Sequence, residues 1–305
     1  MTDSHTTVLL NETLLLLNLS PGLTVFEGTG GSGGLSREIA KRIGEKGTLI
    51  ITDLDAVALE RIKNNLEGAP CQVILLQENF RDIARIIREA GFKLVDRIVL
   101  DLGISTDQIK SSGRGFSFDK DEPLQMTFKN EPTLGDLTAY DVVNSWKEES
   151  LADIFWGFGG ERGARKVARA IVDNRVAKVI ETSGELAEIV MRALGGRRGA
   201  IHPATKVFQA IRIAVNDELG ALRCVLRDGW EVLSQDGRIV VISFHELEDR
   251  EVKKFLKERE SSGQGSILTK KPITPTNAEK ATNPRSRSAK IRAIKKGARE
   301  EKKND

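Results

Sequence analysis

Short apolar segments alternate with amphipathic segments along roughly the first hundred residues, and no other feature constrains the fold as strongly. The apolar segments are 23–27, 47–53, 71–77 and 94–103, and the amphipathic ones are 36–44, 55–66 and 80–91. The former have the length of buried strands, whereas the latter carry apolar residues three and four apart, as helices do. Such alternation predicts an α/β fold, a parallel sheet with helices on both faces.

The alternation stops after Gly103, and the chain then becomes rich in predicted helices. Residues 105–135 are rich in Gly, Ser, Asp and Pro, and residues 138–195 have helical periodicity. Thr182 and Glu185 have the spacing of a capping box, which predicts a helix start. We therefore predict a helical insertion over residues 105–200.

The α/β pattern returns towards the C-terminus. It consists of a long predicted helix near 204–228 and a predicted strand at 237–244. The main domain is thus expected to be discontinuous, formed by residues 1–104 and 201–305. From about residue 261 the chain has the composition of a linker followed by a basic, flexible segment.

The composition is that of a globular protein large enough for one or two domains. The chain has 305 residues, of which 39% are hydrophobic and 30% charged. No apolar run reaches the roughly 18 residues of a membrane span, and no basic-then-apolar leader is present. Cys71 and Cys224 form neither a disulfide framework nor a metal cluster. We expect a cytoplasmic protein that does not associate with membranes.

Charge is distributed unevenly along the chain. Residues 269–305 hold 12 lysines and arginines against 4 acids, which leaves 35 basic and 40 acidic residues in the remainder. A basic segment on an acidic body is typical of a protein that binds nucleic acid. A solvated, partly disordered terminus would give the same pattern.

A glycine-rich loop, "GTGGSGG", follows the first predicted strand. Gly28, Gly30 and Gly33 match the G-x-G-x-x-G pattern, and the loop lies where an open α/β sheet binds ligands. The lysine of a P-loop is missing. Asp53 ends the next strand, 20 residues after Gly33, where a carboxylate would bind ribose hydroxyls. These features alone leave NAD, S-adenosylmethionine and an empty structural turn open.

Two further acids at strand ends favour S-adenosylmethionine. Glu27 beside the glycines would repel a pyrophosphate by about 4 kcal/mol at ~4 Å, but it would suit a sulfonium or ammonium group. Asp101 could accept a hydrogen bond from an amine whose lone pair is delocalised into its ring. The histidines His5, His202 and His245 suggest no metal site, and none is expected.

Six blocks of the sequence, in order from about residue 5 to 292, resemble one family. They are "HTTVLLNE" (5–12), "DLGIS" (101–105), "RGFSF" (114–118), "HPATKVFQAIRIAVNDEL" (202–219), "GRIVVISFHELEDR" (237–250) and "NPRSRSAKIR" (283–292). These blocks resemble the MraW/RsmH family of S-adenosylmethionine-dependent methyltransferases, which methylate the N4 amine of a cytidine in the decoding centre of bacterial 16S ribosomal RNA. The resemblance implies a Rossmann-like class I methyltransferase sheet with an inserted helical domain that recognises the substrate.

The resemblance also implies the positions that contact the cofactor: Gly33, Gly34, Asp53, Phe80, Asp101 and Gln108. Phe80 would lie near the adenine, and Asp53 would bind the ribose. From the chemistry of the amine, Asp101 is the predicted catalytic residue, and either its side chain or a backbone carbonyl beside it would hold the amine. Glu27, Gly28 and Gly30 of the loop are added to this predicted site, together with Leu35, which stands where the family has histidine.

The chain departs from the family pattern at several positions besides Leu35. Glu27 replaces an aspartate, and Gln125, Thr127 and Glu246 replace an acid, an arginine and a serine. Two other hypotheses therefore stay open. One is methylation of another amine, in DNA or protein, and the other is an RNA-associated protein that binds S-adenosylmethionine without activity.

Basic side chains in the insertion and near the C-terminus are candidates for RNA contacts. Arg162, Arg165, Lys166 and Arg169 share one helix face. Phosphate contacts dominate affinity for nucleic acid, although a solvated face would look the same. The C-terminal candidates are Arg285, Arg287, Lys290 and Arg292. The expected partner is 16S rRNA within the small ribosomal subunit. Whether the protein forms a homodimer is left open.

Overall fold

The computed structural model describes residues 7–105, 108–109, 112–196 and 202–297. The chain divides into two compact units. The first runs up to Gly103 and resumes at Leu219, and the second spans Ile104–Glu218. The second unit extends past the boundary predicted near residue 200, because the helix at 205–216 packs its apolar residues into the core of that unit.

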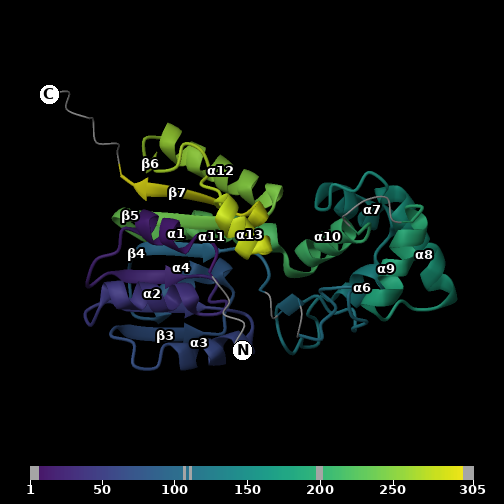
Figure 1. Ribbon diagram of the computed structural model, residues 1–305, viewed down its shortest axis with the longest axis horizontal. Helices are drawn as coiled ribbons and strands as arrows, with labels where there is room; N and C mark the ends of the chain where they lie inside the picture. The colour runs from purple at the N-terminus through teal and green to yellow at the C-terminus, as the bar shows by residue number, and fades with distance from the viewer. Residues whose placement is uncertain (1–6, 106–107, 110–111, 197–201, 298–305) are drawn as a thin grey trace. The chain divides into compact units, whose positions relative to one another are not determined.

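A seven-stranded sheet forms the centre of the first unit, in the order β3-β2-β1-β4-β5-β7-β6 (Figure 1). The strands are β1 (Thr24–Glu27), β2 (Thr48–Thr52), β3 (Gln72–Leu76), β4 (Val95–Asp101), β5 (Leu233–Ser243), β6 (Gly265–Ile267) and β7 (Lys290–Lys296). The strands β1 to β5 pair in parallel, whereas β7 runs antiparallel to both of its neighbours. The predicted Rossmann-like α/β sheet is therefore confirmed.

Helices cover both faces of this sheet, as the apolar strands predict. Three helices pack on one face: α1 (Leu10–Leu17), α2 (Gly34–Ile43) and α3 (Ala56–Asn65). The other face is covered by α4 (Ile83–Glu89), α11 (Glu218–Val232) and α12 (Glu246–Ser261). Neighbouring residues of β1 alternate between the two cores, since Val25 belongs to the first cluster and Phe26 to the second.

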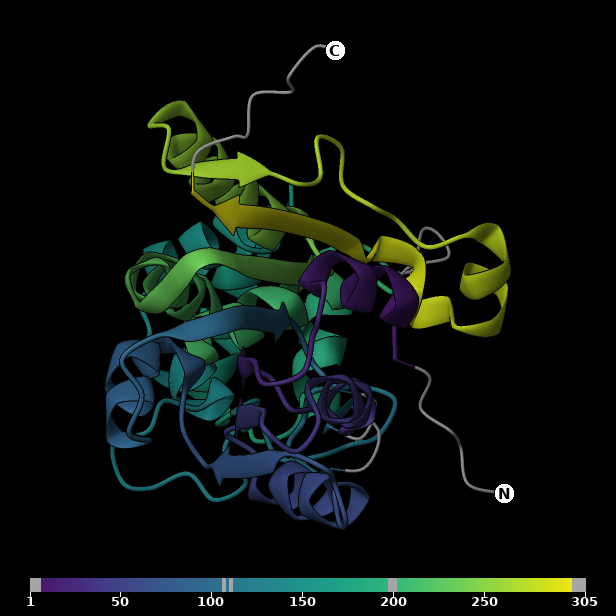
Figure 2. The same ribbon diagram turned by 90° about the vertical axis from the view of Figure 1, so that its left-hand side faces the viewer.

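The C-terminal region is folded, so the prediction of a flexible segment from about residue 261 was wrong over residues 265–296. It contains β6, α13 (Asn277–Thr282), a 3-10 helix at Pro284–Ser288 and β7. Figure 2 shows β7, in dark yellow, running along the sheet. Ile291, Ala293 and Ile294 of β7 are buried. Lysines and arginines alternate with these apolar residues, so the segment did not look like a buried strand in the sequence. Residues 298–305 of the predicted flexible segment lie outside the described residues.

The second unit consists largely of helices around its own core. They are α6 (Ala139–Ser145), α7 (Glu148–Gly157), α8 (Ala164–Ala177), α9 (Ser183–Ala193) and α10 (Thr205–Asn216). The predicted capping box is confirmed, because the Thr182 and Glu185 side chains each accept from the other's backbone at the start of α9. The long helix predicted near 204–228 is instead two helices, α10 and α11. Asp217 separates them by adopting a left-handed conformation, φ 45°.

No helix in the described part of the chain combines the length and the apolar character needed to cross a membrane.

Candidate active site

Three acids lie at the carboxyl ends of neighbouring parallel strands of the first unit. Glu27 ends β1, Asp53 follows β2 and Asp101 ends β4. Since β1 lies between β2 and β4, the strand order reverses here, and the crevice at such a reversal is where open α/β sheets bind ligands. The structure thus brings together the three acids that the sequence singled out.

The glycine-rich loop crosses this edge and is hydrogen-bonded to the strands on both sides. The N–H of Gly28 donates to the Val99 carbonyl at 3.0 Å, and that of Gly30 donates to the Thr52 carbonyl at 3.1 Å. Gly33 begins α2 with φ 79°, a conformation that favours glycine. The loop is therefore fixed by backbone contacts at the N-terminus of α2.

Close packing explains the other glycines of the predicted motif. A Cβ on Gly28 would lie 2.5 Å from Leu100 Cδ2, and one on Gly30 would lie 2.4 Å from Ile62 Cδ1. A Cβ on Gly34 would lie 2.4 Å from the Thr7 hydroxyl. A side chain at any of these positions would force its neighbours to shift whether or not a ligand binds, so the glycine pattern alone does not specify a ligand.

Glu27 is a buried acid whose charge is not compensated by its neighbours. Its side chain is 1% exposed, and among the described residues Oε2 has no hydrogen-bond partner. Burial, together with the nearby Asp101 and Asp53, raises the pKa of Glu27 to about 8, while the Ser36 hydroxyl acts in the opposite direction. The repulsion of a pyrophosphate expected from the sequence requires an ionised carboxylate. At neutral pH this carboxyl is mostly protonated, and a positive charge beside it favours its ionised form.

Asp101 is the second acid with an uncompensated oxygen. Its backbone N–H donates to the Thr29 hydroxyl of the glycine loop at 2.7 Å, which fixes the end of β4 against the loop. Its Oδ1 is buried and has no hydrogen-bond partner within the described part of the chain. Burial and the charge of Glu248 raise the pKa of Asp101 to about 7. A group with this pKa can both hold and release a proton near neutral pH.

Asp53 is held by the loops on either side of it. Its Oδ2 accepts the Gly31 N–H at 3.1 Å, and its Oδ1 accepts the Asp55 N–H at 2.9 Å. Burial raises its pKa despite these hydrogen bonds. Each oxygen keeps a second lone-pair site, so the carboxylate is oriented and still able to accept from a hydroxyl.

The other predicted cofactor contacts, Phe80, Leu35 and Gln108, lie in three different environments. Phe80 begins a 3-10 helix after β3 and lies beside Gly28, whose Cβ would approach the Phe80 Cβ to 3.0 Å. The Leu35 side chain is buried in the core on the α2 face, which leaves only its backbone for a ligand. Gln108 belongs to the second unit, where its Oε1 accepts the Ser105 N–H at 3.0 Å. Its contact with a cofactor stays a prediction.

Sequence reasoning missed Thr29, Ser36 and Glu248. Thr29 orients Asp101, Ser36 lies beside Glu27, and Glu248 acts on the pKa of Asp101. A hydroxyl within a glycine loop was a usable signal for Thr29. Glu248 gave none, because it is far from Asp101 in sequence and is brought near by the start of α12, which His245 caps.

The predicted basic contacts divide into exposed and buried groups. Arg165, Lys166 and Arg169 are exposed on α8, and Arg162 is exposed just before it. Arg292, by contrast, is buried and paired with Asp249, so the prediction that it contacts RNA was wrong. Lys290 is half-buried and donates to the same carboxylate, and its contact with RNA stays a prediction. Arg287 is exposed, and the side chain of Arg285 lies outside the described residues.

A parallel sheet with one antiparallel strand, β7, and with acids at the switch point is the arrangement expected of a Rossmann-like class I methyltransferase. The chain belongs to the MraW methylase family, whose model matches residues 2–297.

Curated relatives of this chain share one name, "Ribosomal RNA small subunit methyltransferase H". The relative from Thermomicrobium roseum is 41% identical over 97% of this chain and 94% of its own length. Those from Koribacter versatilis and Deinococcus deserti are each 44% identical, over 95% and 96% of this chain and 93% of their own lengths. A solved rRNA methylase from Streptococcus thermophilus aligns over 96% of this chain and 98% of its own, with 8% identity and a TM-score of 0.44.

Proposed function

We propose that this chain transfers a methyl group from S-adenosylmethionine to the N4 amine of a cytidine in the decoding centre of 16S ribosomal RNA. The observation that carries the proposal is the pair of buried, uncompensated oxygens, Glu27 Oε2 and Asp101 Oδ1, at the switch point of the sheet. Membership of the MraW methylase family and the name of the curated relatives support it.

The residues at this edge fit S-adenosylmethionine. Its sulfonium and ammonium groups are the kind of charge that would stabilise ionised Glu27 and Asp101, whose pKa values are raised to about 8 and about 7 in its absence. A pyrophosphate would offer no such compensation. Asp53 would accept the ribose hydroxyls, and Phe80 would lie near the adenine.

Asp101 would carry the chemistry on the acceptor side. When bound, S-adenosylmethionine supplies an electrophilic methyl carbon. Asp101 Oδ1 would accept a hydrogen bond from the cytidine amine, which lets the nitrogen lone pair turn from the ring towards that carbon. As the N–C bond forms, the bond between the methyl carbon and sulfur would break and release S-adenosylhomocysteine. Asp101 Oδ1 would take the excess proton of the amine, a task suited to a carboxyl with a pKa of about 7. Orientation by Asp101 and by the loop around Thr29 would contribute most of the acceleration.

The second unit, with its exposed arginines and lysine before and along α8, would recognise the RNA, and the first unit would serve as the methyltransferase domain. A ribosomal substrate would place the reaction in the cytoplasm. Gln108 and the backbone of Gly33 and Gly34 complete the proposed cofactor contacts.

The test is methyl transfer from labelled S-adenosylmethionine to small ribosomal subunits that lack this modification. The product is digested to nucleosides and analysed for N4-methylcytidine. Asp101→Asn keeps the shape of the side chain but cannot take the proton, so it should lower the rate at least a hundredfold. Asp96→Asn removes an acid from the other end of β4, where Asp96 accepts from the Thr24 N–H and the Ser234 hydroxyl, and should leave the rate per folded molecule unchanged.

The outcomes separate the alternatives. Label in DNA or protein but not in the subunits would indicate another amine substrate. Calorimetric binding of S-adenosylmethionine without transfer to any of these substrates would indicate an inactive binding protein. Equal rates for the native protein and Asp101→Asn would show that Asp101 is not the acceptor.

A further inference from the structure

Trp156 is the most conspicuous apolar side chain on the surface of α7. It is 64% exposed, whereas Leu151 and Phe155 of the same helix are fully buried. Because α7 already packs through those two residues, the core does not need the indole. Leaving most of a tryptophan in water forgoes the stabilisation that burial of a large apolar side chain provides. A partner that covers the ring would recover it.

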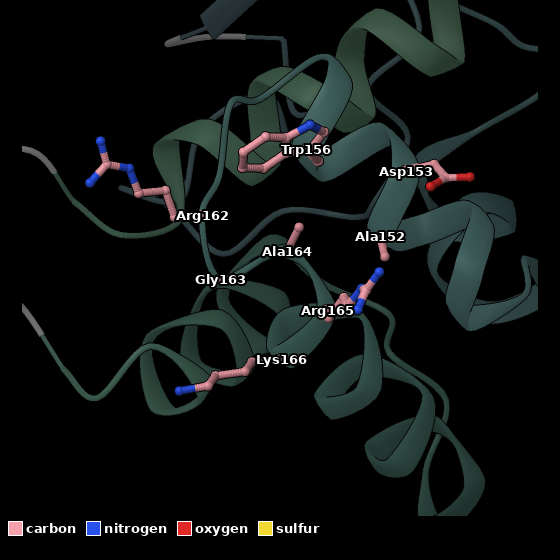
Figure 3. Close-up of a pocket in the computed structure, with 8 residues that line it drawn as sticks. All are labelled: Ala152, Asp153, Trp156, Arg162, Gly163, Ala164, Arg165 and Lys166. Atoms are coloured by element: carbon pink, nitrogen blue, oxygen red, sulfur yellow. The ribbon is translucent and has the colours of Figure 1, made fainter.

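The indole forms part of a hollow of about 490 Å³ between α7 and the start of α8, within the second unit (Figure 3). This volume is in the range of sites that hold small ligands. Arg162, Arg165 and Lys166 line the hollow on the α8 side. Asp153 is its one acidic lining residue, and Figure 3 shows it on the side away from Arg162.

None of the three cationic groups forms an ion pair among the described residues. In the described residues no carboxylate lies within ion-pair distance of Arg162, Arg165 or Lys166, although Arg169, one turn further along α8, lies 3.9 Å from Asp173. Three positive charges and one acid line the hollow beside an exposed aromatic face, while Glu148 and Glu149 lie with Asp153 and Arg165 around an adjoining hollow. Arg162 and Lys166 line only the first hollow and give it an affinity for an anion that carries a flat ring.

We propose that this hollow binds an unpaired nucleotide of RNA, with the base stacked on Trp156 and the adjoining phosphates held by Arg162, Arg165 and Lys166. The inference rests on the proposed function, since it names where the RNA substrate is held apart from the reacting cytidine. Stacking of a base on an aromatic side chain contributes about 1–3 kcal/mol, and cationic side chains bind the backbone. The sequence did not reveal this site, because its aromatic member lies on α7 and its basic members lie on or next to α8.

A single-stranded nucleotide fits these features better than a duplex or a membrane surface does. The bases of a duplex are stacked on one another and hide their faces from an indole. A membrane surface would need a broad apolar band, whereas this hollow has one exposed aromatic ring. Acidic or aromatic protein segments would also suit Trp and Arg, and the test distinguishes them.

The direct test is binding of a fluorescently labelled, unstructured oligoribonucleotide of about 12 nucleotides to the full chain, followed by anisotropy. Trp156→Ala should weaken binding by about fivefold to a hundredfold, and Trp156→Phe should retain much of the affinity. Arg165→Gln with Lys166→Gln should weaken binding and reduce the salt dependence by about 0.7 per lost phosphate contact. Tyr140→Ala, an exposed aromatic on α6, and Lys257→Gln, an exposed lysine on α12, are the controls and should bind as the native chain does.

Intrinsic fluorescence provides a readout that is independent of affinity and of activity. The oligoribonucleotide should quench the native protein, and Trp156→Phe should lose that quenching, while Trp146 and Trp230 remain. If the Trp156 variants bind the oligoribonucleotide as tightly as the native chain and are quenched as strongly, the proposal is wrong. A hollow that holds a protein segment in place of RNA would give this result. If the native chain methylates subunits and these variants bind RNA normally, only this inference fails. If the native chain methylates nothing but the Trp156 effects appear, the proposed function fails and this site stands.

Discussion

Arg292 and Asp249 form a buried ion pair that joins β7 to α12. Arg292 Nε donates to Asp249 Oδ1 at 2.6 Å, and Nη2 donates to Oδ2 at 3.2 Å. Lys290 Nζ approaches the same carboxylate at 3.3 Å. Two of the basic residues that suggested an RNA-binding tail therefore hold the C-terminal strand in the sheet.

Arg292→Ala should destabilise the protein by about 3 kcal/mol, because it leaves Asp249 buried without its main partner. Urea unfolding measures this loss. Arg287→Ala removes an exposed arginine from the same segment and should change the free energy of unfolding by less than about 0.5 kcal/mol. Equal effects of the two variants would contradict a structural role for the pair.

The ion pair between Arg292 and Asp249 should make the free energy of unfolding depend on pH. Burial tends to raise the pKa of Asp249, but Arg292 and Lys290 outweigh that effect and lower it. A lowered pKa stabilises the fold above the unfolded value near 3.8 and loses that contribution as the pH falls through the folded value. Asp249→Asn should therefore be much less stable than the native chain at pH 7, with a gap that narrows towards pH 3. A gap that does not change with pH would contradict this prediction.

Glu27→Gln should stabilise the protein at alkaline pH. The pKa of Glu27 is about 8 in the fold against 4.5 in the unfolded chain, so the native protein loses stability as pH rises from 4.5 to 8. The variant escapes this loss, which is on the order of 5 kcal/mol when complete. Unfolding at pH 5 and pH 8.5 should show the variant gaining on the native chain. Glu60→Gln, an exposed control, should show no such gain.

Binding of S-adenosylmethionine should release protons near pH 7. A cation beside Glu27 and Asp101 favours their ionised forms, and the raised pKa values leave both partly protonated beforehand. Calorimetry in buffers with different ionisation enthalpies counts the protons, and affinity should increase from pH 6 to pH 8. Glu27→Gln should release fewer protons. Binding heats that do not depend on the buffer would show that neither acid faces the positive charge.

Thr29→Val should lower methyl transfer, because it leaves the Asp101 backbone N–H without its acceptor and frees the end of β4. The loss of stability should be about 1–3 kcal/mol. Thr29→Ser keeps the hydroxyl and should restore both properties. If the serine variant is as impaired as the valine variant, the hydrogen bond is not what positions Asp101.

Gly30→Ala should destabilise the first unit by about 1–3 kcal/mol, since its Cβ would overlap Ile62 Cδ1 and lie 2.9 Å from Ile51 Cγ2. Gly157→Ala at the end of α7 is the control, because a Cβ there meets nothing within 4 Å. That variant should be neutral or slightly stabilised. If Gly30→Ala leaves the free energy of unfolding unchanged, the neighbouring side chains can move aside for the added Cβ.

Local patterns were enough to predict the α/β alternation, the acids at three strand ends and the start of α9, because each depends on periodicity or on spacing within a few residues. It also indicated the family, through blocks that run in order along the chain. The tertiary structure decided the rest. Only packing shows that a Cβ on Gly28 or Gly30 would meet Leu100 or Ile62, and that β7 is a buried strand.

Burial and long-range contacts account for these differences. The pKa of Glu27 is set by desolvation and by carboxyls on other strands, which no local pattern records. Asp217 turns left-handed between two helices although neither glycine nor proline marks the break. Arg292 and Asp249 are 43 residues apart, and Trp156 meets the cations of α8 only because two helices pack side by side. Contacts of this kind form only when the chain folds, because they depend on which surfaces the core brings together.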